Sequence, residues 1–137
     1  MERILLFVEP GPRPARAARW ALALAHRLEA RVIAASVIDP AELAGDPGLE
    51  AKLSDLEEQS WKILYEIEDD AFKADVKISL LLDQGDPLDR LVELGRSYGA
   101  DLLVLGEGSA VAPAEILKRS PAPVCFIVKR DRQTKER

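Results

Sequence analysis

Short apolar runs alternate with segments of helical periodicity along almost the whole chain. The runs are rich in leucine or β-branched residues and are bounded by Gly, Pro or Asp, which is typical of strands. They span residues 4–8, 32–38, 76–82, 102–105 and 124–128. Between them, apolar residues recur every three or four positions, which predicts helices over about 15–28, 47–71, 87–99 and 113–119. Because parallel strands are joined by crossovers of this length, the alternation predicts a doubly wound α/β domain, a five-stranded parallel sheet with helices on both faces.

Two of the helices carry recognisable start signals. Asp46 followed by Pro47 predicts the start of the second helix, and Asp86 followed by Pro87 that of the third, since an aspartate cap and a first-turn proline favour helix initiation. Gly99 is a plausible left-handed cap at the end of the third helix.

The polarity of the strands predicts their order. Runs 4–8 and 102–105 are continuously apolar, as expected of central strands covered on both faces. Run 76–82 alternates polar and apolar residues, which favours an edge. We therefore expect the order 3-2-1-4-5, with the fifth strand at the other edge.

That fifth strand carries no charge before Lys129. An uncharged apolar edge is prone to aggregate unless something covers it. We expect a homodimer in which two fifth strands meet, with Val124, Phe126 and Val128 as candidate contacts. Shielding by the last helix and the tail is the alternative.

The composition argues against several classes of function. A chain of 137 residues is one domain, which we place at 1–129, followed by a basic tail at 130–137 that we expect to be disordered. The net charge of −5 argues against nucleic-acid binding. With one Cys and one His, neither a disulfide framework nor a Cys/His zinc site is possible; we interpret Cys125 as an apolar strand residue and His26 as a helix-surface residue. No run is long enough to span a membrane or form a signal peptide, so we expect a cytoplasmic protein without a membrane partner.

In such a sheet, ligands bind beyond the carboxyl ends of the strands where the winding reverses, here between the first and fourth strands. The two loops concerned are 9–14 and 106–109. Gly106 and Gly108 are typical of a tight turn, and they are also compatible with backbone amides that bind an anion. A carboxylate at Glu107 would repel phosphate, and neither a dinucleotide fingerprint nor a Walker A loop is present.

The order of several segments resembles the universal stress protein family across nearly the whole chain. The segments are Ile4–Glu9, Ala34–Pro40, Gly85–Pro87, Ala100–Gly106 and Pro121–Val124. The resemblance implies a 3-2-1-4-5 sheet, often dimeric through the fifth strand, and a role in the stress response.

Members of this family that bind ATP carry Gly-x-x-Gly, nine residues and then Gly-Ser/Thr after the fourth strand, and an Asp at the end of the first. This sequence lacks the second glycine pair and has Glu9 in place of the Asp. The resemblance therefore implies a degenerate nucleotide site, whose candidate residues are Glu9, Arg13, Val37, Gly106, Gly108 and Ser109. We expect no tight ATP binding, and ATP or AMP at most as a weak ligand.

These observations predict a noncatalytic dimer that acts by protein association or by sensing a small ligand, without a metal or cofactor. The alternative is an adenine-nucleotide switch with a shortened phosphate loop. Slow phosphoryl hydrolysis, a third hypothesis, lacks a base, a set of metal ligands and a Walker lysine.

Overall fold

The computed structural model describes residues 1–10, 14–106 and 109–128. Strands and helices alternate from β1 to β5, which confirms the predicted α/β organisation. In chain order the elements are β1 (Arg3–Phe7), α1 (Pro14–Leu28), β2 (Arg31–Ile38), the 3₁₀ helix η1 (Pro40–Leu43), α2 (Leu49–Lys73), β3 (Ile78–Gln84), α3 (Pro87–Ser97), β4 (Leu102–Gly106), α4 (Pro113–Arg119) and β5 (Val124–Ile127). The basic tail at 130–137 lies outside the described residues. Among the helices described, none is long and apolar enough to cross a membrane.

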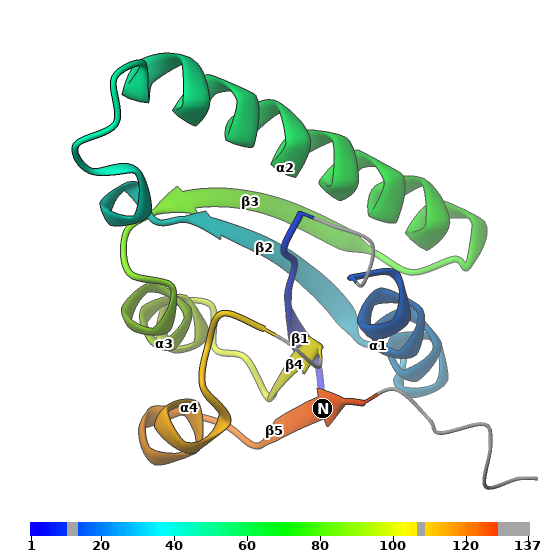
Figure 1. Cartoon of the computed structure of the whole chain (residues 1–137). Helices are drawn as coiled ribbons and strands as arrows, with labels where there is room; N and C mark the ends of the chain where they lie inside the picture. Colours follow the sequence, from blue (N-terminus) through cyan, green and yellow to red (C-terminus); the bar gives the residue numbers. More distant parts are fainter. Residues whose placement is uncertain (11–13, 107–108, 129–137) are drawn as a thin grey trace, which may run out of the picture.

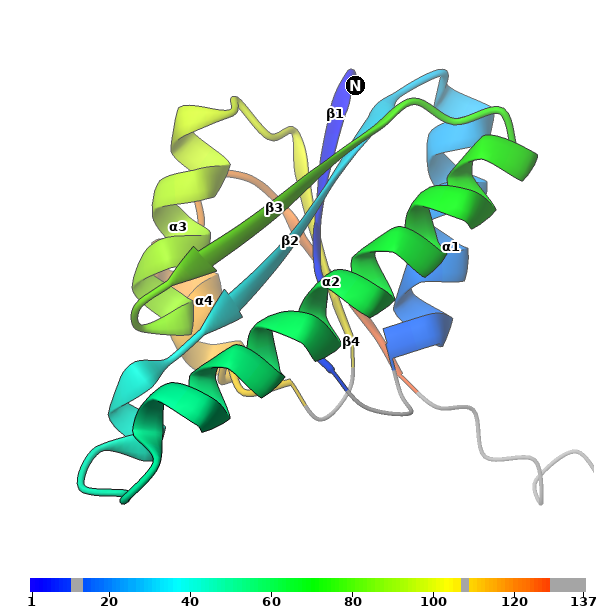
Figure 2. The same cartoon turned by 90° about the horizontal axis from the view of Figure 1, so that it is seen from above.

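The five strands form one sheet in the order β3-β2-β1-β4-β5, and every neighbouring pair is parallel. This is the order that the strand polarity predicts. Figures 1 and 2 show the sheet as a middle layer, with α1 and α2 on one face and α3 and α4 on the other. The carboxyl ends of β1, β2 and β4 consequently lie along one edge.

Alternate side chains of the central strands enter two separate cores. Ile4 and Leu6 of β1 pack on the face covered by α1 and α2, whereas Leu5 and Phe7 pack on the face covered by α3 and α4. Burial of both faces explains why β1 and β4 read as continuous apolar runs. The end of β1, next to Glu9, is thus enclosed between the two cores.

The start of α2 differs from the prediction. The helix begins at Leu49, and its cap is Gly48, whose φ of 92° is left-handed. Asp46 does not cap it; its carboxylate pairs with the Lys52 ammonium at 2.9 Å. Gly48, with its positive φ, separates the Asp46-Pro47 pair from the helix. The predicted cap, Asp46, is therefore wrong, and the observed cap lies two residues later.

The ends of α3 match their predictions. The Asp86 carboxylate accepts a hydrogen bond from the Asp89 backbone N–H at 2.9 Å, and Pro87 occupies the first turn. Gly99 has φ 61°, the left-handed conformation that glycine adopts at least cost. The start of α3 is therefore held beside the carboxyl end of β2 and β3.

Candidate functional site

A groove of about 280 Å³ lies at the carboxyl edge of the sheet. It is lined by residues after β1 and β4, by the end of β2 with Asp39 and η1, by one side of α2 and by the first residue of α3. These are Glu9, Pro10, Val37, Ile38, Asp39, Glu42, Leu56, Gln59, Ser60, Pro87 and Ala110. Small-molecule sites in proteins usually measure roughly 300–1,000 Å³. The groove therefore lies just below the usual range of volumes for small-molecule sites.

Glu9 links the two loops that the sequence singled out. Its Oε2 accepts a hydrogen bond from the Ala110 backbone N–H at 2.9 Å, so the segment after β1 is tied to the segment after β4. The carboxylate thereby occupies a backbone donor that an anionic ligand at this edge would need. Glu9 and Val37, both predicted from the sequence, line the same groove.

The remaining predicted site residues are placed differently. Ser109 Oγ accepts from the Val111 backbone N–H at 3.1 Å, which closes a turn ahead of α4. Gly106 ends β4, and a Cβ added there would meet the Ala17 Cβ at an ordinary 3.6 Å, so lack of space does not require glycine. Arg13 and Gly108 lie outside the described residues.

Carboxylates dominate the polar lining. Glu9, Asp39 and Glu42 line the groove, and among the described residues none that lines it is Lys, Arg or His. Asp39 accepts from the Ala41 backbone N–H at 2.9 Å and so caps η1. Within the described part of the chain no three His, Cys, Asp or Glu residues are grouped to hold a metal ion, so these three carboxylates do not form a metal site.

A buried polar pair includes one residue that lines the groove. Ser60 of α2 is 1% exposed, lines the groove and accepts a hydrogen bond from Ser36 of β2 at 3.3 Å between the hydroxyl oxygens. Sequence reasoning missed Ser60 as a site residue, together with Glu42, Gln59 and Ala110. A serine within the apolar stripe of α2 is the one signal that marks this position.

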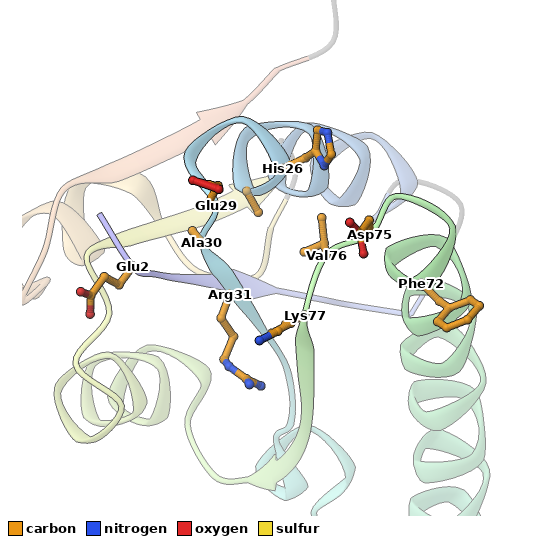
Figure 3. Close-up of a pocket in the computed structure, with 10 residues that line it drawn as sticks. Glu2, His26, Glu29, Ala30, Arg31, Phe72, Asp75, Val76 and Lys77 are labelled. Atoms are coloured by element: carbon orange, nitrogen blue, oxygen red, sulfur yellow. The ribbon is translucent and has the colours of Figure 1, made fainter.

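A larger hollow of about 1,070 Å³ lies at the opposite edge, around the amino ends of β2 and β3 (Figure 3). The labelled side chains fan outward, and the Phe72 ring, 86% exposed, points away from Arg31 and Lys77. Acidic and basic side chains both line this hollow, but they do not point toward a common centre. Because ligands of open parallel sheets bind at the carboxyl edge, we take the smaller groove as the candidate site.

The chain matches the model of a known protein family. The model of the universal stress protein family matches residues 1–124. Among solved structures, a protein of that family from Burkholderia pseudomallei is 23% identical, covers 92% of this chain and 95% of its own, and superposes with a TM-score of 0.79. No curated protein sequence gives a significant match.

Two similar structures contain nucleotides. A universal stress protein solved in complex with cAMP is 25% identical, with 93% of this chain and 96% of that chain covered and a TM-score of 0.71. A family protein from Arabidopsis thaliana, solved with AMP bound, is 16% identical, with 98% and 95% covered and a TM-score of 0.76.

Proposed function

This chain belongs to the universal stress protein family, and from that premise we propose that it is a noncatalytic stress-response protein that senses a small ligand in the groove at the carboxyl edge. The observation that carries the proposal is the hydrogen bond between Glu9 and the Ala110 backbone N–H. In it a carboxylate takes up a backbone donor just after β4, where tight ATP binding would need free donors.

Two further features support a binding role without catalysis or tight ATP binding. The described lining contains no His, the side chain most often used as a general base, and no Cys or Lys nucleophile. No lining residue is basic, so the triphosphate of ATP would lack a counter-charge among the described residues.

Calorimetric titration with ATP and magnesium tests the proposal. We expect no tight binding, and we expect native mass spectrometry of the purified protein to detect a small co-purifying ligand. Tight, magnesium-dependent ATP binding would contradict the proposal, as would the failure of every small-molecule candidate to raise the melting temperature at saturation, since a ligand specific for the native state must stabilise it.

The second candidate is an adenine-nucleotide switch, favoured by the relatives solved with cAMP and AMP. Its site would comprise Glu9, Arg13, Val37, Gly106, Gly108 and Ser109. Titration with AMP and cAMP separates the two functions, because a switch must bind one of these nucleotides more tightly than the corresponding nucleoside.

We also propose that the protein is a homodimer through β5, whose candidate contacts are Val124, Phe126 and Val128.

A further inference from the structure

One side of α2 carries a stripe of aromatic side chains. The chain has two Trp, two Tyr and three Phe residues, and one of each lies on this helix, as Trp61, Tyr65 and Phe72. Their spacing of four and then seven residues places all three on the same side of a helix. The stripe is about 16 Å long, because a helix rises about 1.5 Å per residue.

The stripe becomes more exposed toward the end of α2. Trp61 is half-buried against the core, Tyr65 is 54% exposed and Phe72 is 86% exposed. The Trp61 and Tyr65 rings stack with their centroids 5.5 Å apart. Figure 3 shows the Phe72 ring pointing away from the strands. The buried face of the helix is formed by other residues, Ser60, Leu64, Ile67 and Ala71. Packing within the described chain therefore accounts for Trp61 but not for Phe72.

Carboxylates flank the rings. Glu58, Glu68 and Asp69 are exposed, and each lies three or four residues from a ring of the stripe, which is the spacing of neighbours on a helix surface. Among the described residues none of the three forms an ion pair. The whole of α2 carries eight Asp and Glu residues against three Lys, in a chain whose net charge is −5. The stripe thus combines apolar rings with negative charge.

The stripe is separate from the other two surfaces for which we propose a role. None of its rings or flanking carboxylates lines the groove at the carboxyl edge. Figure 1 shows α2 lying along β3 and β2, whereas β5 is at the other end of the sheet. A dimer through β5 therefore leaves the stripe exposed, and a contiguous apolar surface that remains exposed is typical of a site for another protein.

The chemistry of the stripe favours a cationic partner that also contacts aromatic rings. Arginine meets both requirements, because its planar guanidinium stacks on aromatic faces and pairs with carboxylates through two parallel hydrogen bonds. Lysine is a compact, strongly hydrated charge and has no planar group to stack. A helix laid along α2 has the same residue repeat as α2, so arginines three or four positions apart on it would meet successive rings of the stripe.

From these observations we propose that the stripe is a docking surface for an arginine-rich helix of a partner protein. The guanidinium groups of that helix stack on Trp61, Tyr65 and Phe72, and they donate hydrogen bonds to the flanking carboxylates. The inference is independent of ligand binding in the groove, and it adds a protein partner to the proposed function.

A synthetic peptide tests the inference on the full chain. The probe is an alanine-based helical peptide of about sixteen residues with an arginine at every third or fourth position, long enough to span the stripe. Trp20→Phe leaves Trp61 as the only tryptophan, so its fluorescence reports directly on the stripe. We expect the arginine peptide to change the Trp61 emission and to bind at least about tenfold more tightly than the same peptide with lysines. Equal affinity for the two peptides would show attraction between charges alone and would overturn the stacking contact.

Two lysine substitutions locate the contact. Phe72→Lys should weaken binding of the arginine peptide at least about tenfold, since it removes a ring and adds a charge of the same sign as the peptide. Val128→Lys adds the same charge beyond β5 and should leave peptide binding unchanged. Both residues are exposed, and an unchanged urea unfolding transition confirms that each variant is folded.

Two charge-neutral double variants test the carboxylates. Glu68→Gln with Asp69→Asn should weaken the arginine peptide at least about tenfold, and it should also reduce the loss of affinity that added salt causes, because fewer charges remain to be screened. Glu66→Gln with Asp70→Asn removes the same charge from another side of α2 and should change the affinity by less than about threefold. Equal effects of the two double variants would overturn the placement of the partner on the stripe.

Other results would assign the stripe to a different occupant. If deletion of the basic segment 130–137 raised peptide affinity at least about tenfold, the occupant would be that segment of the chain itself. If Phe72→Lys lowered the sedimentation mass, the occupant would be a second copy. Either result, or the absence of peptide binding at low salt, would overturn the partner helix and leave ligand sensing in the groove standing.

Discussion

At the scale of single residues, Asp101 ties the amino end of β1 to the start of β4. Its Oδ2 accepts from the Glu2 backbone N–H at 2.8 Å and from the Arg3 backbone N–H at 2.9 Å. Hydrogen bonds to a carboxylate favour its charged form, so these two amides hold the pKa of Asp101 below its ordinary value, aided by the nearby N-terminus and the Arg3 guanidinium. The central pair of strands is thereby clamped at the edge away from the groove.

We predict that this clamp makes stability depend on acid pH. Because the folded-state pKa lies below the unfolded one, the contribution of Asp101 is fully present above the ordinary aspartate pKa and is lost as pH falls below about 4. Asp101→Asn should therefore be less stable than the wild type at pH 7, and the difference should shrink between about pH 4 and pH 2. Urea unfolding at several pH values measures it, and a difference that is constant with pH would contradict the assignment.

At the scale of elements, three Asp-Pro pairs show what a sequence can and cannot specify. Asp39-Pro40 starts η1 and Asp86-Pro87 starts α3, each with the aspartate as cap, but Asp46-Pro47 is followed by a left-handed Gly48 and caps nothing. The Asp-Pro pair is the same in all three, but only Asp46-Pro47 is followed by a glycine, and the left-handed φ of Gly48 separates that pair from α2. Local sequence therefore predicts that a helix follows, but its first residue depends on how the chain packs.

Removal of the α3 cap should have a measurable cost. Asp86→Ala leaves the Asp89 N–H without its acceptor, and loss of an N-cap typically costs about 1 kcal/mol. We expect the free energy of unfolding in urea to fall by that amount, with an unchanged m-value. Asp69→Ala, an exposed aspartate within α2, is the matched control and should change stability by less than about 0.5 kcal/mol.

The groove, like the helix starts, was predicted only in part. Hydrophobic pattern and topology predicted this edge of the sheet and the loop that begins at Glu9, because strand ends follow from pattern. The family resemblance added Glu9 and Val37 as candidate residues, and both line the groove. Ser60 and Ala110 were not predicted. The serine in the apolar stripe of α2 is a signal only once the helix is placed over the end of β2, and a backbone N–H such as that of Ala110 has no signature in residue type. The carboxylate that closes the loop is visible only once both segments are placed.

At the scale of the whole molecule, the two edges of the sheet are unequal. α2, the longest helix, lies along β3 and β2 (Figure 1). β5 pairs with β4 on one side, and no strand of the described residues lies on its other side. The side chains of β5 are all half-buried, and Val128 beyond it is 62% exposed. Such an edge offers unpaired backbone groups and apolar side chains to a second copy, arranged about a twofold axis.

We predict that wild-type protein sediments at twice its chain mass of 15.1 kDa and that Val128→Lys weakens the dimer at least about tenfold, because a lysine places like charges at the contact of two identical edges. Phe72→Lys is the matched control, since Phe72 is equally apolar, more exposed and lies on α2 toward the other side of the sheet. If only the Phe72 variant weakened the dimer, the interface would lie on α2 and not on β5. A wild-type protein that stays monomeric at all concentrations would leave β5 shielded within one chain, and the dimer proposal would be wrong.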